Sequence, residues 1–248
     1  MLTLLYANEA RARRCWAFRL GLGVSVGYCA FLVFINVIEK ATRLGRSIVP
    51  LDWYVLSPFS AVLFFCPLFC YVFLSAEYED GWLRSKLTIG HTRKSVYLSG
   101  YLAVYGASAA VLLAATATVA VLHIPLLGGW VARPARVASS YAAGLLTLGA
   151  YAACCSLPAQ LIAGRAASAL ACLLPALLAF VAQSYVQSHR SAMGPLWAFW
   201  SDLSPMGQLI QLTRDGLDHP GRAACLSLLV TAAALLAGML AFQKKNLR

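Results

Sequence analysis

Long apolar stretches separated by short polar ones make up most of this 248-residue chain. A helix that crosses the hydrocarbon core of a bilayer needs roughly 20 mainly apolar residues. Six stretches meet that requirement: Trp16–Ile38, Pro58–Ala76, Leu98–Leu122, Ser139–Ala163, Ala167–Ser188 and Ala223–Phe242. Since little of the chain lies outside them, the sequence predicts an all-α, polytopic membrane protein with six transmembrane helices. Residues 1–248 then form a single transmembrane domain.

Composition agrees with this prediction. Hydrophobic residues make up 60% of the chain and charged residues 12%, whereas soluble domains carry about 25% charged residues. The first apolar stretch is too long for a cleavable signal peptide and lacks a small-residue cleavage pattern.

The net charge of +11 would suggest nucleic-acid binding in a soluble protein. Here the basic residues flank apolar stretches, so a membrane surface is the expected partner and nucleic acid is not. With the N-terminus in the cytoplasm, 12 of the 20 Lys and Arg residues lie on the cytoplasmic side and 8 on the other. The positive-inside rule therefore predicts a multi-pass protein of the cell membrane with both termini cytoplasmic.

Two segments outside the spans have an amphipathic composition. Residues 1–15, MLTLLYANEARARRC, mix leucines with arginines and predict an interfacial helix; a disordered basic tail is the alternative. Residues 189–221 hold Trp197, Phe199 and Trp200 among prolines without an uninterrupted span. This pattern predicts a pair of short re-entrant or interfacial helices on the external side of the membrane, and a surface loop with aromatic anchors is the alternative.

A charged insert, residues 77–97 (EYEDGWLRSKLTIGHTRKSVY), separates the second and third apolar stretches. Asp80 is a favourable helix N-cap and Gly90 a favourable C-cap, while Thr92 can cap the helix that follows. Between the caps, apolar Trp82, Leu83, Leu87 and Ile89 alternate with polar Arg84, Ser85 and Lys86. The insert therefore predicts a short amphipathic helix; a plain basic loop is the alternative.

Residue patterns for common catalytic sites are missing. The sequence has no GxxxxGK[ST] phosphate loop, no HExxH and no GxSxG. Cys66 and Cys70 lie one helical turn apart, but no His or carboxylate is near them in sequence, so we expect buried apolar cysteines and no metal site. Span interiors hold few ionisable groups, which disfavours a proton-coupled transporter and a membrane-embedded enzyme. Gly23 and Gly27 form a small-xxx-small pattern that predicts close helix packing or a dimer interface.

The insert resembles the coupling-helix region of type-2 ABC exporter permeases. The resemblance lies in E-Y-x-D-G-x-x-R-x-K-L-x-I-G-H-x-R from Glu77 to Arg93, in LSPMGQL (Leu203–Leu209) and in the ending AFQKKNLR (Ala241–Arg248). With the six spans it covers essentially the whole chain. Many relatives have Thr after the Asp-Gly pair, where this chain has Trp82.

The resemblance implies a permease subunit that pairs with a second permease chain, identical or related, and with cytoplasmic ABC ATPase subunits. ATP and magnesium would bind in that partner ATPase, and this chain would have no catalytic residue and no cofactor. Trp82, Leu83 and Leu87 would anchor the helix in a groove of the ATPase, while Arg84 and Lys86 would pair with its acids. The coupling residues implied are Glu77, Asp80, Gly81, Trp82, Leu83, Arg84, Lys86, Leu87, Gly90 and Arg93. An embedded enzyme and a membrane scaffold or assembly protein without transport activity are the alternatives.

Overall fold

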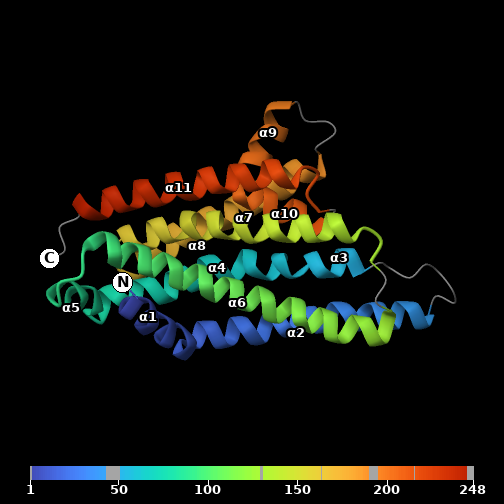
Figure 1. Ribbon diagram of the computed structural model, residues 1–248, viewed down its shortest axis with the longest axis horizontal. Coiled ribbons are helices and arrows are strands. Elements are labelled where there is room, and N and C mark those ends of the chain that lie inside the picture. The colour runs from blue at the N-terminus through green and yellow to red at the C-terminus, as the bar shows by residue number, and fades with distance from the viewer. Residues whose placement is uncertain are drawn as a thin grey trace.

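The protein is an elongated bundle of helices in a computed structural model that describes residues 2–42, 51–128, 131–162, 164–189, 195–214 and 216–244 (Figure 1). Every regular element in those ranges is a helix. In chain order they are α1 (Leu2–Arg14), α2 (Trp16–Thr42), α3 (Leu51–Leu56), α4 (Pro58–Glu79), α5 (Trp82–Thr88), α6 (Arg93–Leu127), α7 (Pro134–Leu161), α8 (Arg165–Ser188), α9 (Pro195–Leu203), α10 (Pro205–Arg214) and α11 (Pro220–Lys244).

Six of these helices are long and apolar enough to cross a membrane: α2, α4, α6, α7, α8 and α11, with α3 leading directly into α4. They coincide with the six predicted spans, so the prediction of an all-α protein with six candidate membrane-spanning helices is confirmed. Most of the helices extend beyond the apolar stretches into charged residues, such as Arg93 and Lys244. Hydropathy marks the lipid-compatible part of a helix, whereas backbone hydrogen bonds continue into the polar flanks.

Helices α4 and α7 form the centre of the bundle. In the most apolar stretch of each helix, 61% of the residues of α4 and 67% of those of α7 are buried, compared with 17% for each of α2, α8 and α11. The two central helices approach closely because α7 carries glycine where α4 carries an aromatic ring. A Cβ added at Gly144 would lie 2.5 Å from the Phe59 ring. The outer helices expose leucine, valine and aromatic side chains, which suits a lipid environment.

Three segments that are distant in sequence meet at one end of the bundle, here called the α5 end. Figure 1 shows α1, α5 and the C-terminal end of α11 together there. Leu4, Leu83, Tyr97 and Phe242 from α1, α5, α6 and α11 form one buried apolar cluster at this end. Residues 2–14 are helical, so the alternative of a disordered basic tail is wrong for them. The position of α1 on a membrane surface stays a prediction.

Residues 195–214 form two short helices, α9 and α10, and the alternative of a surface loop is therefore wrong for this part of the segment. Helix α10 is buried along most of its length and is held by Gln208, whose Oε1 accepts hydrogen bonds from Thr147 and Ser227 at 2.8 Å each. Helix α9 projects from the side of the bundle and exposes Trp197 and Trp200 (Figure 1). Entry of these helices into a bilayer stays a prediction.

Candidate functional site

The polar insert folds into a helix–turn–helix connection at the α5 end. Gly81 has a φ of +71°, a left-handed conformation that glycine adopts without the steric cost of a Cβ. This residue reverses the chain between α4 and α5. Asp80 was the expected N-cap of the short helix, and that assignment is wrong. Asp80 instead ends α4, with its backbone N–H bonded to the Ala76 carbonyl at 3.0 Å, and Gly81 occupies the N-cap position of α5.

The caps predicted at Gly90 and Thr92 are confirmed. Gly90 has a φ of +97° just beyond the end of α5. Its N–H donates to the Leu87 carbonyl at 3.0 Å, and the N–H of His91 donates to the Lys86 carbonyl at 3.2 Å. This pair of bonds is the Schellman pattern of a helix C-terminus. Thr92 Oγ1 accepts a hydrogen bond from the Ser95 N–H at 3.3 Å and caps α6. The orientation of α5 is thus fixed at both ends by backbone geometry.

A buried carboxylate, Glu77, ties α4, α5 and α1 together. Its Oε1 lies 2.7 Å from Lys86 Nζ and 2.9 Å from a guanidinium nitrogen of Arg11. Glu77 is 4% exposed and Lys86 7%. A buried charge is costly unless it is paired and hydrogen-bonded, and here one carboxylate satisfies two cations. We call Glu77, Lys86 and Arg11 the Glu77 triad.

Neutral partners complete the hydrogen bonding around the triad. Lys86 Nζ also donates to Asn8 Oδ1 at 2.9 Å, and Asn8 Nδ2 donates to Ser99 Oγ on α6 at 3.2 Å. Arg11 donates to the Phe73 carbonyl at 2.9 Å, and its guanidinium lies 4.0 Å from the centroid of the Phe73 ring. Desolvation lowers the pKa of Lys86 below its usual 10.5, while the neighbouring Glu77 opposes that shift. The network thus joins α1, α4, α5 and α6 through polar contacts.

The short helix has one buried face and one exposed face. Leu83, Lys86 and Leu87 are spaced three and four residues apart, so they lie on one side of α5. Leu83 is 5% exposed and packs in the cluster with Leu4 and Phe242, and Leu87 packs against the same cluster. The expected contacts of these three residues with a partner therefore find no support in this conformation, because the chain itself contacts them.

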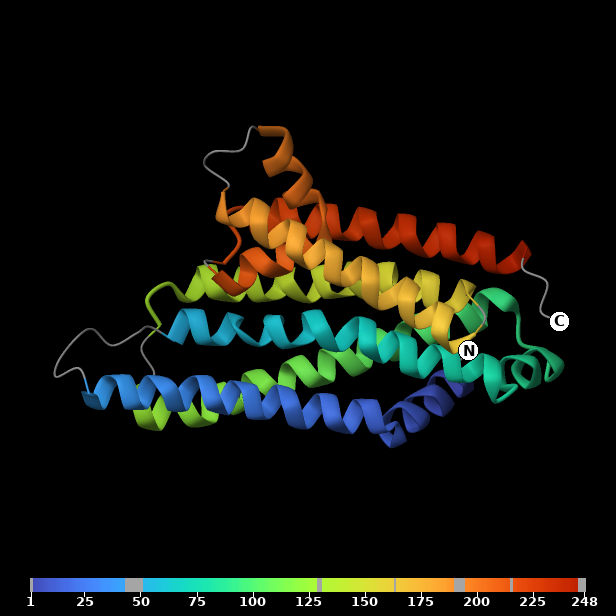
Figure 2. The ribbon, with the colours of Figure 1, turned by 180° about the vertical axis from the view of Figure 1, so that it is seen from behind.

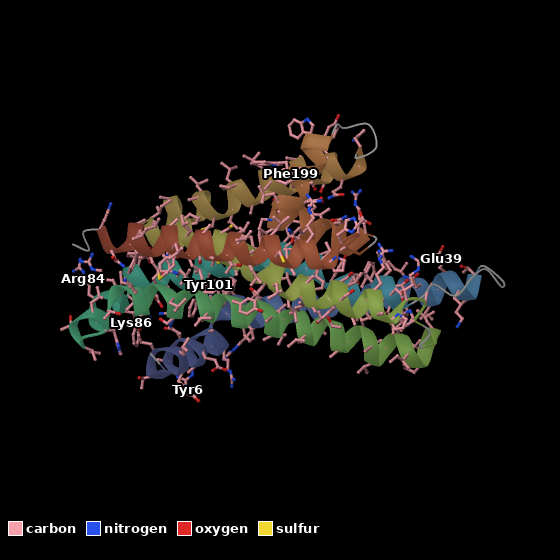
Figure 3. The ribbon with its side chains drawn as sticks, turned by 45° about the horizontal axis from the view of Figure 1, so that its top comes forward. Tyr6, Glu39, Arg84, Lys86, Tyr101 and Phe199 are labelled. Atoms are coloured by element: carbon pink, nitrogen blue, oxygen red, sulfur yellow. The ribbon has the colours of Figure 1, made fainter. Side chains whose placement is uncertain are left out.

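The remaining side chains of α5 are exposed. Trp82 is 52% exposed and Ile89 76%, and Arg84 is also exposed. Figure 3 shows Arg84 at the extremity of the molecule, with Lys86 closer to the helix that carries Tyr6. A groove of about 440 Å³ separates α5 from α1 and is lined by Trp82, Ile89 and His91, among others. An apolar and basic surface is therefore available beside α5.

Two further arginines connect helices at this end. Arg93, an implied coupling residue, donates to the Gln243 carbonyl at 2.7 Å and so joins the start of α6 to the end of α11. Arg165, at the start of α8, lies 2.5 Å from a carboxylate oxygen of Glu79. Sequence reasoning did not select Asn8, Arg11 or Arg165 for the site. The only signal for Arg11 was its place in a basic amphipathic segment, which does not name a partner.

Gly23 and Gly27 face open space among the residues that the structure describes. A Cβ at either position would have no heavy atom within 4 Å. The close approach on this helix occurs at Gly21, where a Cβ would lie 2.2 Å from the Phe65 ring. A dimer interface at Gly23 and Gly27 stays a prediction.

Cysteines Cys66 and Cys70 are fully buried in the central core. Among the residues that the structure describes, no group of three His, Cys, Asp or Glu side chains is arranged to hold a metal ion.

No family model and no curated protein matches this chain. Its functional interpretation therefore depends on the residues and their geometry.

Proposed function

We propose that this protein is the transmembrane permease subunit of an ATP-driven ABC exporter, located in the cell membrane with both termini in the cytoplasm. In this proposal, α5 is the coupling helix and docks on a separate cytoplasmic ABC ATPase, which binds ATP and magnesium. A second permease chain, identical or related, completes the transporter.

One observation carries the proposal: α5 lies at the end of a bundle of six apolar helices, with one exposed face and one face bonded to the bundle. Its two termini are capped, and its inner face is fixed by the Glu77 triad and Leu83. A flexible loop would absorb a displacement of the partner, whereas a helix fixed to α1, α4 and α6 transmits it to the bundle. Stabilising one arrangement of the ATPase would then shift the population of permease conformations.

Side-chain exposure reduces the set of residues that we propose for docking. Trp82 and Arg84 are exposed on α5, and Ile89 is exposed just beyond its end. Trp and Arg are the residue types that most often dominate binding energy at protein interfaces. Glu77, Leu83 and Lys86 are then proposed as positioning residues, since they hold α5 in place without facing outward.

The test is recovery of an ATPase with the tagged chain from its native membrane. We expect an ABC-type ATPase to co-purify with the unmodified chain, and Arg84→Glu or Trp82→Ala to weaken that association about 30-fold, the effect of losing one strong interface contact. Arg133→Glu is the matched control, because Arg133 is exposed next to the start of α7, away from the α5 end. Absence of any ATPase, or equal loss with the control variant, would contradict the proposal.

A further inference from the structure

A second groove, of about 540 Å³, opens at the α5 end where α1, α4 and α8 meet. Arg11, Arg14 and Arg165 line its mouth, together with Asp80. The other wall is apolar and comes mainly from Trp16, Leu68 and Val72. The groove is thus basic at the end of the bundle and apolar toward its middle.

The charges at the mouth do not cancel. Arg11 is paired with Glu77 at 2.9 Å and Arg165 with Glu79 at 2.5 Å. Arg14 makes no ion pair with any residue in the described ranges and is exposed.

The lining groups and their ion partners can be counted together. Four cations (Arg11, Arg14, Arg165 and Lys86) stand against three carboxylates (Glu77, Glu79 and Asp80), an excess of one positive charge. The mouth is therefore complementary to a single negative charge.

The apolar wall follows one face of α4. Phe64, Leu68 and Val72 are spaced four residues apart, which places them in one row along the helix. Phe64 is 53% exposed and Leu68 38%. Ala76 continues this row to the mouth of the groove. At 1.5 Å per residue, the apolar row from Ala76 to Phe64 spans about 18 Å, close to the roughly 15 Å of one hydrocarbon leaflet.

The row lies open between two outer helices. Figure 2 shows α4 between α2 and α8 on this side of the bundle. At the inner end of the row, Phe64 meets Phe180 of α8 edge to face, with ring centroids 5.0 Å apart. An acyl chain entering from the bilayer would contact α4 up to this aromatic pair.

We propose that this groove binds an anionic phospholipid of the leaflet at the α5 end. Its phosphate contacts Arg14, with Arg11 and Arg165 nearby, and its acyl chains lie along Leu68 and Val72. Basic pockets between transmembrane helices are suited to acidic lipid headgroups, and the apolar row gives a lipid contacts that a free anion cannot make. The inference depends on the candidate membrane spans and not on the proposed transport function.

The test measures lipid binding to the full chain purified in a neutral detergent, by native mass spectrometry and by thermal unfolding. The probes are phosphatidylglycerol, uncharged phosphatidylcholine and glycerol 3-phosphate. We expect saturable retention of one phosphatidylglycerol per chain, with a raised melting temperature. We expect about tenfold weaker binding of phosphatidylcholine, because its quaternary ammonium cancels the charge of the phosphate and is repelled by the net positive mouth. Glycerol 3-phosphate should not raise the melting temperature.

Arg14→Gln should reduce the binding of phosphatidylglycerol about tenfold, to the level of phosphatidylcholine. Arg13→Gln is the matched control, because Arg13 is exposed on the same helix, pairs with Glu9 and does not line the groove. It should change binding by no more than about twofold.

Equal binding of phosphatidylglycerol and phosphatidylcholine to the unmodified chain would overturn the proposal. This result needs no variant. Equal effects of the two substitutions would also overturn it. If glycerol 3-phosphate raises the melting temperature and phosphatidylglycerol does not, the mouth binds a small anion. A stable dimer that excludes lipid and dissociates in Arg14→Gln would assign the groove to a second copy of the chain. Either of these two results would overturn the proposal that the groove binds a lipid.

Discussion

Replacing Glu77 with glutamine should release α5 from the bundle. The substitution keeps the size of the side chain and removes the one negative charge that faces Lys86 at 2.7 Å and Arg11 at 2.9 Å. Removing one partner of a buried ion pair costs about 3–5 kcal/mol, because the other charge remains buried without compensation.

The lower end of that range applies here, for two structural reasons. The side chain of Arg11 is 25% exposed and can turn toward solvent. The pKa of Lys86 is already lowered by burial, and loss of Glu77 lowers it further, so deprotonation limits the penalty. A cost of about 3 kcal/mol corresponds to a local opening equilibrium about 100-fold more favourable.

Hydrogen–deuterium exchange of the backbone amides of α5 is the assay, because it measures local opening directly. We expect Glu77→Gln to accelerate exchange about 100-fold at the hydrogen-bonded amides of α5 and its C-terminal turn, such as Ser85, Ile89 and His91, while the centres of α4 and α7 stay protected. Glu9→Gln is the matched control: Glu9 also pairs with an arginine of α1, but its side chain is 54% exposed. An exposed pair contributes at most about 0.5–1 kcal/mol, so exchange in α5 should change by about fivefold or less.

A double variant separates charge from packing. Glu77→Gln combined with Lys86→Met should recover part of the protection, since a buried ion pair can be replaced by apolar groups at little cost. If Glu77→Gln and Glu9→Gln have the same effect on α5, the triad does not hold this helix and the reasoning is refuted.

Three further outcomes follow from the geometry. Gly238→Ala should destabilise the bundle by about 1–3 kcal/mol, since its Cβ would lie 1.9 Å from the Tyr97 hydroxyl. Gly23→Ala has open space around it and should stabilise α2 by up to about 1 kcal/mol, because alanine has the higher helix propensity; reversible unfolding in mixed micelles compares the two variants. Gly90→Ala should cost about 1–2 kcal/mol, because its φ of +97° strains any residue with a Cβ; the α5 exchange rates would detect this, and unchanged rates would contradict it. Burial lowers the pKa of Lys86 in the folded state, so the unfolded state binds more protons as the pH approaches 10.5. The contribution of Lys86 to the free energy of unfolding should therefore rise as the pH increases toward 10.5. Unfolding at a series of pH values should show this rise in the unmodified chain but not in Lys86→Met.

Much of the local structure could be predicted from the sequence. The six spans follow from hydropathy alone, because any stretch of about 20 apolar residues has the same requirement for backbone hydrogen bonding in lipid. The caps at Gly90 and Thr92 were equally predictable, because each depends on the chemistry of one residue and the backbone beside it. Asp80 shows the limit of such reasoning. It is a favourable N-cap residue, but the left-handed Gly81 takes the N-cap position, so α5 begins one residue later than predicted.

Only the tertiary structure decided which side of α5 faces the bundle. The sequence shows that Leu83, Lys86 and Leu87 share one face and that Trp82 and Ile89 lie elsewhere, but an amphipathic pattern predicts burial of an apolar face, not of a lysine. Lys86 is buried because Glu77 of α4 and Asn8 of α1 meet it there. Asn8 and Lys86 lie 78 positions apart, and no local pattern specifies such a contact.

The sequence by itself therefore determined the helical class and the number of candidate membrane spans, the polar insert between the second and third spans, and the basic character of its surroundings. The folded chain determined that Glu77 holds Arg11 and Lys86, that Arg14 remains exposed, and that an apolar row on α4 continues from the basic mouth. The physical reason is the distance along the chain over which each interaction acts. Hydropathy and capping act within a few residues, whereas the pairing of buried charges depends on which helices come within hydrogen-bonding distance of one another.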